Sequence, residues 1–180
     1  SPRRPEVFFE GNGALRFFLS NSRAPIIEPE AMTAIESARR NAATLLERDF
    51  GKRISAIFLH APVAQNRQIM LELEERYPQA FEADRHSQFR SHTDVEVNSW
   101  LHHYYAYLTG RAVPGSLRYG YFDINQAKLR KQMSRAGKVG KLQVFCVNDG
   151  PPENPDDEDF GPWFAQWMAE KFPRRSSFER

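Results

Sequence analysis

The segment 54–59 reads Ile-Ser-Ala-Ile-Phe-Leu and is followed directly by His60-Ala61-Pro62. A short, mostly apolar run that stops at a polar residue and a proline is typical of a strand buried on both faces. A second run of this kind, 142–147, ends at Asn148-Asp149-Gly150. We therefore expect two buried strands, each followed immediately by polar side chains.

Segments with helical periodicity surround these runs. The third of them starts at Thr93, because Thr93 and Glu96 have the spacing of a capping box. A further strand is expected at 119–122. The fold class is thus α/β, helix-rich with a small, largely parallel sheet, and part of that sheet is expected to come from elsewhere. The expected helices are 30–49, 64–76, 93–108, 123–135 and 160–168, the fourth capped by Asp123 with Gln126.

The amino-acid composition excludes several classes of protein. Of 180 residues, 41 % are hydrophobic and 13 % aromatic, which is enough to bury a core in one compact domain. Lys and Arg total 25 against 23 acidic residues, a balance that argues against a dedicated nucleic-acid binder. The lone Cys146 excludes an internal disulfide and a multi-cysteine zinc site. No apolar run is long enough to span a bilayer, and the absence of an initiator Met indicates a processed or excised piece.

The polar residues after the two strands allow two interpretations. Ligands of open α/β sheets bind beyond the carboxyl ends of the strands, so His60 and Asp149 would line one cleft if the strands were parallel neighbours. Alternatively, both segments are plain turns. The residue types favour a turn for Asn148-Asp149-Gly150 and leave His60 balanced between the two.

Arg90 precedes the helix expected at 93–108. A guanidinium beside a helix N-terminus makes a cradle for phosphate, since the free backbone N–H groups add to its charge. The alternative is a surface ion pair with Asp94 or Glu96, which the residues alone favour.

Other polar clusters have simpler explanations. The segment 128–141 carries six basic residues and no acidic one. A solvated face is the favoured interpretation, and a contact for anionic lipid, nucleotide phosphate or nucleic acid is the alternative. The run Asp156–Asp159 precedes the last helix, where carboxylates favour the helix dipole. A metal site at the histidines is disfavoured because His102 and His103 are adjacent and no His-x-x-x-His spacing occurs.

Two blocks resemble conserved regions of the Stealth family. Residues 59–108 are similar to its third region and residues 142–180 to its fourth. The first two regions of that family are absent here. The matching residues are His60-Ala61-Pro62, Asn66-Arg67, Tyr77-Pro78, Phe89-Arg90, Asp94 and Tyr104-Tyr105, then 144–149, Phe172-Pro173 and 176–179.

The resemblance implies that residues 1–180 form the C-terminal part of a single nucleotide-sugar transferase catalytic domain. It implies transfer of hexose-1-phosphate from a UDP-sugar to a glycan hydroxyl, with a divalent metal, Mg²⁺, as cofactor. The implied catalytic residues are His60, Arg90 and Asp149. Substrate would be bound by Arg67, Arg90 and Asn148, and metal by Asp149.

The expected partners are a nucleotide-sugar donor, a glycan acceptor and the upstream half of the same enzyme, with no nucleic acid. The expected location is the bacterial cytoplasm, with peripheral membrane contact through 128–141. Two other functions stay open at this point: a non-catalytic module that binds a partner or membrane, and an ordinary glycosyltransferase that moves sugar without phosphate.

Overall fold

The computed structural model describes residues 7–24, 26–135, 140–151 and 160–174. The chain divides into two compact units, Ser1–Ser116 and Leu117–Arg180. Within the described ranges, every helix is too short or too polar to cross a lipid bilayer.

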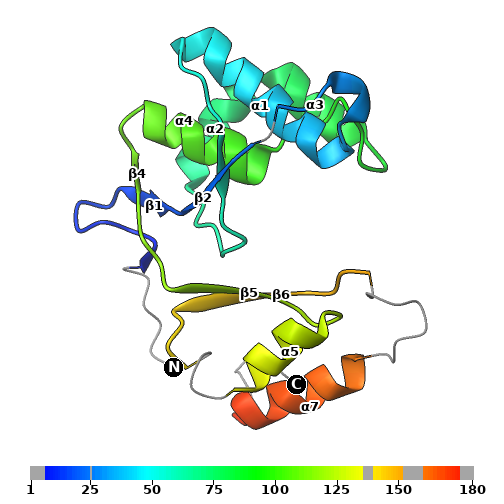
Figure 1. Cartoon of the computed structure of the whole chain (residues 1–180). Coiled ribbons are helices and arrows are strands. Elements are labelled where there is room, and N and C mark those ends of the chain that lie inside the picture. Colours follow the sequence, from blue (N-terminus) through cyan, green and yellow to red (C-terminus); the bar gives the residue numbers. More distant parts are fainter. Residues whose placement is uncertain (1–6, 25, 136–139, 152–159, 175–180) are drawn as a thin grey trace. The chain divides into compact units, whose positions relative to one another are not determined.

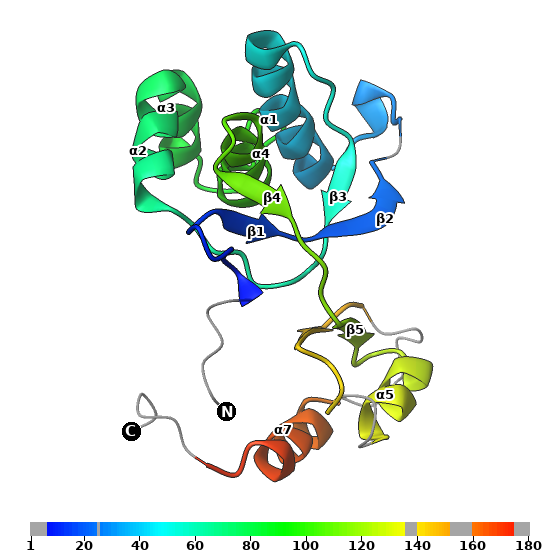
Figure 2. The same ribbon diagram turned by 90° about the vertical axis from the view of Figure 1, so that its left-hand side faces the viewer.

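The strands of the first unit pair in two different ways. β1 (Leu15–Phe17) runs parallel to β4 (Ala112–Pro114), with Leu15 opposite Ala112. β2 (Leu19–Arg23) runs antiparallel to β3 (Ala56–Phe58), with Leu19 opposite Phe58. Figure 2 shows α1 and α4 on the same side of β1 and β4. The unit therefore has a thin strand layer beneath a helical layer.

The helical layer of the first unit contains more elements than the sequence predicted. A 3-10 turn, η2 (Pro29–Ala31), precedes α1, and α2 is followed at once by α3, which was not expected. A π-helical turn, η3, leads directly into α4. The bounds of the remaining elements are Ala34–Phe50 for α1, Arg67–Arg76 for α2, Pro78–His86 for α3, Val97–Leu101 for η3 and His102–Leu108 for α4.

The capping box lies at the start of α1, and the one expected at Thr93 is wrong. The Thr33 hydroxyl accepts from the Glu36 N–H, and the Glu36 carboxylate accepts from the Thr33 N–H. Glu96 instead accepts from the side chain of Arg39, so it does not close a cap with Thr93. The helix expected from 93 therefore begins only at Val97.

The core of the first unit contains large aromatic side chains from the strands, from η3 and from α4. The ring of Phe58 meets those of Phe17, Trp100 and Tyr104 at centroid distances of 5.8, 6.1 and 5.1 Å. Tilted and edge-on contacts of this kind add to the free energy gained from burial. Leu46, Ile69, Leu73 and Leu101, each at most 1 % exposed, fill the space between the helices.

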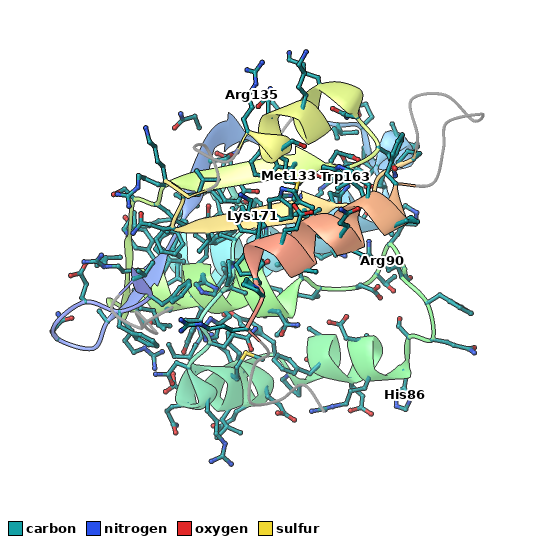
Figure 3. The ribbon with its side chains drawn as sticks, turned by 90° about the horizontal axis from the view of Figure 1, so that it is seen from below. His86, Arg90, Met133, Arg135, Trp163 and Lys171 are labelled. Atoms are coloured by element: carbon teal, nitrogen blue, oxygen red, sulfur yellow. The ribbon has the colours of Figure 1, made fainter. Side chains whose placement is uncertain are left out.

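The second unit is a parallel strand pair covered by two helices. β5 (Tyr119–Asp123) and β6 (Val144–Asn148) pair residue for residue, so their carboxyl ends meet at Asp123 and Asn148. α5 (Ala127–Ser134) and α7 (Gly161–Lys171) lie on one side of this pair (Figure 1). Met133 and Trp163, labelled in Figure 3, belong to the apolar cluster between helices and strands.

These observations confirm the fold class, helix-rich α/β with small and mostly parallel sheets. The condition under which His60 and Asp149 would line one cleft, that β3 and β6 are parallel neighbours, is not met. β3 pairs antiparallel with β2, whereas β6 pairs with β5 in the other unit. The acidic run 156–159, Lys138 and the closing residues 176–179 lie outside the described residues.

Candidate functional site

A pocket of about 650 Å³ in the first unit contains both His60 and Arg90. His60 follows β3, Arg90 lies on the loop after α3, and α1 contributes the small or apolar wall of Ala34, Ile35 and Ala38. Figure 3 labels Arg90 on this loop, past His86 at the end of α3. Two of the predicted site residues are therefore brought together.

The backbone around His60 is held by two hydrogen bonds. The N–H of Leu59 donates to the carbonyl of Phe18 over 2.9 Å, which continues the β2–β3 pairing by one step. The N–H of Ala61 donates to the carbonyl of Leu59 over 2.7 Å and turns the chain. Because the strand ends on a buried Phe58, His60 emerges at the surface with its side chain exposed.

The loop that carries Arg90 is tied on both sides of it. The Asp94 carboxylate accepts from the Ser87 hydroxyl over 2.9 Å and from the Ser91 N–H over 2.7 Å. From α1, the Asn41 amide donates to the carbonyls of His92 and Asp94, each over 2.9 Å. These bonds order residues 87–94, so Arg90 is presented on a defined backbone.

The Arg90 guanidinium is exposed and forms no hydrogen bond or ion pair with any residue that the structure describes. The ion pair considered from the sequence is not seen. Asp94 is taken by the two serines, and Glu96 accepts from Nε of Arg39 over 2.8 Å. Since an Arg without a carboxylate partner retains its full donor capacity, this side chain is available to an anion in the pocket.

Sequence reasoning missed two charged residues of this pocket, Arg39 and Asp84. Burial is the main cause that raises the pKa of Asp84, and the charge of Asp94 adds to it, while a hydrogen bond from the Val95 N–H works against both. A signal for Asp84 existed in the sequence. It follows Tyr77 and Phe81 at helical spacing, which places a carboxyl on the core-facing stripe of α3.

Arg67 is placed differently from His60 and Arg90. It is the first residue of α2, after Asn66, whose side chain caps the helix by accepting from the N–H groups of Gln68 and Ile69. Arg67 is exposed and does not line the pocket of His60. Arg67 therefore lies at the start of α2, outside the lining of the pocket of His60 and Arg90.

Asn148 and Asp149 stand in the second unit, at the carboxyl end of the parallel pair. The Asn125 amide donates to Oδ1 of Asp149 over 2.7 Å and also to the carbonyl of Gly150. The Asn148 amide donates to the buried carboxylate of Asp123 over 3.4 Å. A side chain at Gly150 would overlap that carboxylate and displace it. The turn expected from Asn-Asp-Gly is thus part of a larger polar network.

The carboxylates of this network do not form a complete metal site. The oxygens of Asp123 accept from Asn148 and from the N–H groups of Asn125 and Gly150, and Asp149 accepts from Asn125. Across the described ranges, no three His, Cys, Asp or Glu residues converge as metal ligands do. A metal at Asp149 would need further ligands from elsewhere.

Comparison with known proteins adds the family. Residues 59–107 match the model described as Stealth protein CR3, conserved region 3. The chain is 36 % identical to an exopolysaccharide phosphotransferase of Streptomyces coelicolor, over 180 aligned residues that cover 99 % of this chain. The chain thus contains conserved region 3 of the Stealth family.

Other Stealth relatives align over the same extent. An exopolysaccharide phosphotransferase of Nocardia farcinica is 35 % identical over 182 residues, and the capsular polysaccharide phosphotransferase SacB of Neisseria meningitidis serogroup A is 30 % identical over 194. Each alignment covers 99 % of this chain. The chain spans about a third of the length of these curated relatives, namely 31, 36 and 34 %.

The Stealth region 3 match includes three of the predicted site residues, His60, Arg67 and Arg90. Its start at residue 59 agrees with the block identified from the sequence, and its end differs from it by one residue. Asn148 and Asp149 lie outside this match.

Proposed function

We propose that the chain is the C-terminal part of an enzyme that transfers hexose-1-phosphate from a UDP-sugar to a glycan hydroxyl in capsule or exopolysaccharide synthesis. The names of the relatives support a phosphotransferase role in polysaccharide synthesis. The proposal of hexose-1-phosphate transfer rests mainly on the pocket that His60 and Arg90 share. In it, the Arg90 guanidinium has no partner among the described residues.

Arg90 neutralises the phosphate that is transferred. Phosphoryl transfer depends mainly on positioning and charge stabilisation, because the protein has little covalent chemistry to perform. A guanidinium on an ordered loop can hold two non-bridging oxygens at once, which an ammonium does less well. Arg90 would therefore bind the β-phosphate of the donor and stabilise the charge that develops on it.

His60 acts as the base in this proposal. The acceptor hydroxyl oxygen attacks the β-phosphorus while its proton passes to the imidazole. The bond from that phosphorus to the bridging oxygen breaks, and UMP leaves with the bonding electrons. The product is a phosphodiester between the hexose and the acceptor, so atoms and charge balance without a further reactant.

The remaining predicted groups have supporting roles here. Asn148 orients a hydroxyl or phosphate, and Arg67 contacts phosphate from the start of α2. We propose that Mg²⁺ takes most of its ligands from the upstream half of the enzyme, because Asp149 alone cannot hold it. Bound there, the cation would neutralise the leaving phosphate.

The test uses full-length enzyme and matched pairs of variants. His60→Ala and Arg90→Lys should each lower kcat by about 100-fold or more, because each removes a group that acts in the transition state. The controls are His86→Ala and Arg85→Lys, which change neighbouring exposed residues that pair with Glu82 and Glu74 outside the pocket. All four variants should keep the wild-type unfolding temperature.

Phosphorus-31 NMR of the product separates the alternatives. A phosphodiester resonance supports hexose-1-phosphate transfer, whereas a plain glycoside identifies an ordinary glycosyltransferase. Full activity of His60→Ala and Arg90→Lys would refute the assignment of the pocket and favour a binding module.

We also propose peripheral contact with the inner face of the bacterial membrane. Lys128, Lys131, Arg135 and Lys141 are exposed on the second unit, so this segment can meet anionic headgroups. Sedimentation with phosphatidylglycerol vesicles should fall when these four residues are changed to Gln. Unchanged sedimentation would remove this contact from the proposal.

A further inference from the structure

Phe89 is a large aromatic side chain on the loop 87–94 that has no part in the proposed reaction. Its ring is 80 % exposed and makes no ring contact with any residue that the structure describes. A single exposed apolar side chain needs no explanation by itself. Phe89, however, lines the pocket of His60 and Arg90, so its ring is available to a ligand of that pocket.

The backbone on both sides of Phe89 is held in place. The Ser87 N–H donates to the carbonyl of Ala83 over 3.1 Å, at the end of α3, and the Asp94 carboxylate accepts from Ser87 and Ser91. A phenylalanine has only two side-chain torsions, so a ring on ordered backbone loses little conformational freedom when a ligand covers it. The cost of ordering Phe89 on binding is therefore small.

Other groups of the same pocket suit a sugar. α1 adds apolar surface through Ala34, Ile35 and Ala38. On α3, Oδ1 of Asp84 accepts from the Val95 N–H over 3.0 Å, whereas Oδ2 has no partner among the described residues. A sugar ring has C–H groups on its faces and hydroxyls at its edge, so it needs an apolar platform together with a hydrogen-bond acceptor.

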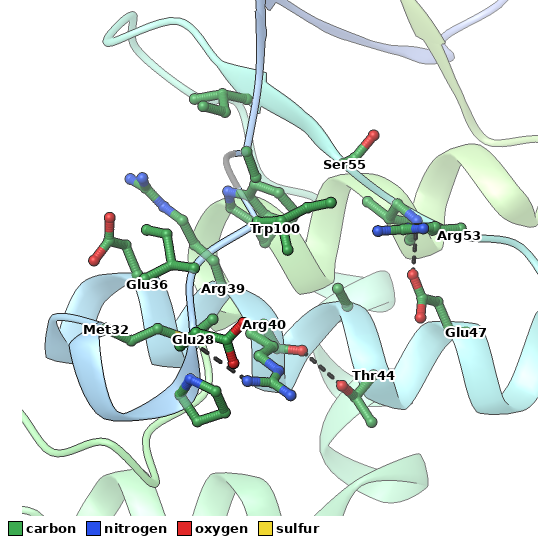
Figure 4. Close-up of a pocket in the computed structure, with 17 residues that line it drawn as sticks. Glu28, Met32, Glu36, Arg39, Arg40, Thr44, Glu47, Arg53, Ser55 and Trp100 are labelled. Carbon is green, nitrogen blue, oxygen red and sulfur yellow. Dashed lines mark hydrogen bonds between the residues drawn. The ribbon is translucent and has the colours of Figure 1, made fainter.

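The guanidinium of Arg39 does not compete with Arg90 for an anion in this pocket. Arg39 is paired with Glu96 over 2.8 Å. It also lines a second cavity, of about 670 Å³, which Figure 4 shows beside α1. That lining has three carboxylates and three guanidiniums, so its charges balance and give no preference for phosphate. A phosphate bound beside Phe89 is therefore expected at Arg90.

The geometry of the transfer places the donor's hexose close to the residue beside Arg90. The attacking and leaving oxygens lie on opposite sides of the β-phosphorus, and three further oxygens surround it between them. In the proposed reaction two of these three are non-bridging oxygens held by Arg90, and the third is bonded to C1 of the hexose. Consecutive Cα atoms are about 3.8 Å apart, so Phe89, which lines the same pocket, is within reach of that hexose. The uracil is farther away, because the α-phosphate and the ribose separate it from the β-phosphorus.

We propose that Phe89 stacks on the apolar face of the donor's hexose and so positions hexose-1-phosphate for transfer. This inference rests on the proposed function. The C–H groups on one face of a pyranose pack against the electron-rich face of an aromatic ring. Asp84 accepts from a hydroxyl at the edge of the same sugar. Phe89 thus contributes affinity that a UDP-sugar gains and UDP alone does not.

A binding measurement isolates the contribution of the hexose. Full-length enzyme with Mg²⁺ is titrated with UDP and with four UDP-hexoses, namely UDP-glucose, UDP-galactose and their 2-acetamido forms. The best of these should bind wild type about tenfold or more tighter than UDP. Phe89→Ala should weaken that UDP-hexose about tenfold, which corresponds to about 1.4 kcal/mol, and leave the affinity for UDP unchanged. Phe89→Trp should retain the wild-type difference, because it keeps an aromatic face.

Steady-state kinetics supply a second readout. Phe89→Ala should raise KM for the UDP-hexose about tenfold and leave KM for the glycan acceptor at its wild-type value. Ile26→Ala is the matched control, because Ile26 is 88 % exposed and lines the second cavity instead. This control should keep wild-type affinity for UDP and for the UDP-hexose. All three variants should keep the wild-type unfolding temperature.

The outcomes separate this inference from the proposed function. An unchanged difference between UDP-hexose and UDP in Phe89→Ala, with Arg90→Lys inactive, would overturn the hexose contact alone. Weaker binding of UDP itself would also overturn it, because the ring would then stack on uracil. The same holds for a raised acceptor KM with normal donor binding, or for a lowered unfolding temperature with normal affinities. Full activity of Arg90→Lys would instead overturn the proposed function.

Discussion

The backbone N–H of Asn66 donates a hydrogen bond to Nε2 of His102 over 3.0 Å. His102 is fully buried in α4, whereas Asn66 closes the segment that starts at His60 and caps α2. Because this N–H can only donate, Nε2 of His102 accepts, and Nδ1 of the same ring lies 3.4 Å from Nδ1 of His103. A buried imidazole thus anchors the far end of the loop that begins with the proposed base.

This anchor makes stability depend on pH. Burial is the main cause that lowers the pKa of His102 from 6.5 to about 4, and the neighbouring His103 lowers it further. Since the unfolded chain binds a proton more readily than the folded one, the stability that neutral His102 provides is complete above about 6.5 and is lost as pH falls toward 4. Urea unfolding should show the free energy of unfolding decline by up to about 3 kcal/mol over this range.

His102→Gln is the variant that isolates this effect. The Gln side-chain oxygen can accept near the position of Nε2 but does not titrate, so the decline between pH 6.5 and 4 should become shallower. The exposed His86→Gln serves as the control and should leave the pH profile unchanged. An identical profile in His102→Gln and wild type would assign the acid sensitivity to other groups.

Asn41 should affect catalysis through the loop that it holds. Asn41→Ala removes both hydrogen bonds from the side-chain amide to the carbonyls of His92 and Asp94. Residues 87–94 thereby lose an attachment to α1. We expect a fall in kcat of about tenfold and a loss of about 1 kcal/mol in stability. Steady-state kinetics and thermal unfolding measure these two effects.

A double-mutant cycle decides whether Asn41 acts through Arg90. Asn41→Ala should have little further effect on kcat in enzyme that already carries Arg90→Lys, because the position of the guanidinium no longer matters. Fully additive losses would make Asn41 a purely structural residue. Asn98→Ala, an exposed amide at the start of η3, is the control.

Tyr77 links the ends of α1 and α2 through Asp49. Asp49 accepts from the Tyr77 hydroxyl and from Nε of Arg76, both over 2.8 Å, and from Nε of Arg48. These hydrogen bonds lower the pKa of Asp49 to about 2, and the one from Arg48 has the largest effect. Burial is the main cause that raises the pKa of Tyr77 to about 12, and its hydrogen bond to Asp49 adds to this. Because the pKa of Asp49 is lower in the folded state, the ionised carboxylate stabilises the fold fully above about pH 3.8. This contribution disappears as the pH falls to about 2.

Tyr77→Phe should therefore destabilise the first unit by about 1 kcal/mol at neutral pH, since one buried hydrogen bond is lost. It should also raise the pKa of Asp49, which carboxyl NMR titration measures. A variant with unchanged stability and unchanged Asp49 titration would contradict a role for the hydroxyl. Tyr107→Phe, at a 45 % exposed position, is the control.

Trp167 should contribute more to stability than Trp163. Trp167 is 6 % exposed and packs against Phe145 with a centroid distance of 6.1 Å, whereas Trp163 is partly buried at the edge of the same cluster. Trp167→Ala should cost about 3–5 kcal/mol and Trp163→Ala clearly less. Thermal unfolding followed by near-UV circular dichroism measures both, and a reversed order would mean that α7 presents a different face to the sheet.

The sequence predicted those elements whose signal is local. Runs of apolar residues identified β3 and β6, and helical periodicity over 160–168 identified α7. α3 was missed because helices usually end before a proline, and Pro78 follows the helix expected at 64–76. Proline also fits the first turn of a new helix, where its missing N–H costs nothing, and that is its place here.

Local patterns could not decide between positions that look alike. Thr33 and Thr93 are each followed by Glu three residues later, yet only the first forms a capping box. After Thr93, Glu96 instead forms an ion pair with Arg39 on α1, a partner that is far away in the sequence. The pairing of β3 with β2 was missed for the same reason, because nothing within either strand specifies its neighbour.

The candidate site was predictable only in part. His60 and Arg90 were singled out by strand-end position and by the resemblance, and one pocket contains both. Arg39 and Asp84 enter that pocket through helix packing, which depends on contacts between α1, α3 and the loop 87–94. The roles of Arg67, Asn148 and Asp149 stay predictions.

The pairing of Leu15 with Ala112 joins the two ends of the first unit and constrains how the protein is made. A ribosome synthesises β1 before the helices of this unit, whereas its parallel partner β4 emerges only after them. The nascent chain must therefore carry Leu15 and Phe17 without their final neighbours while α1 and α2 form. Chaperones and the rate of translation through α4 should accordingly influence the yield of folded protein.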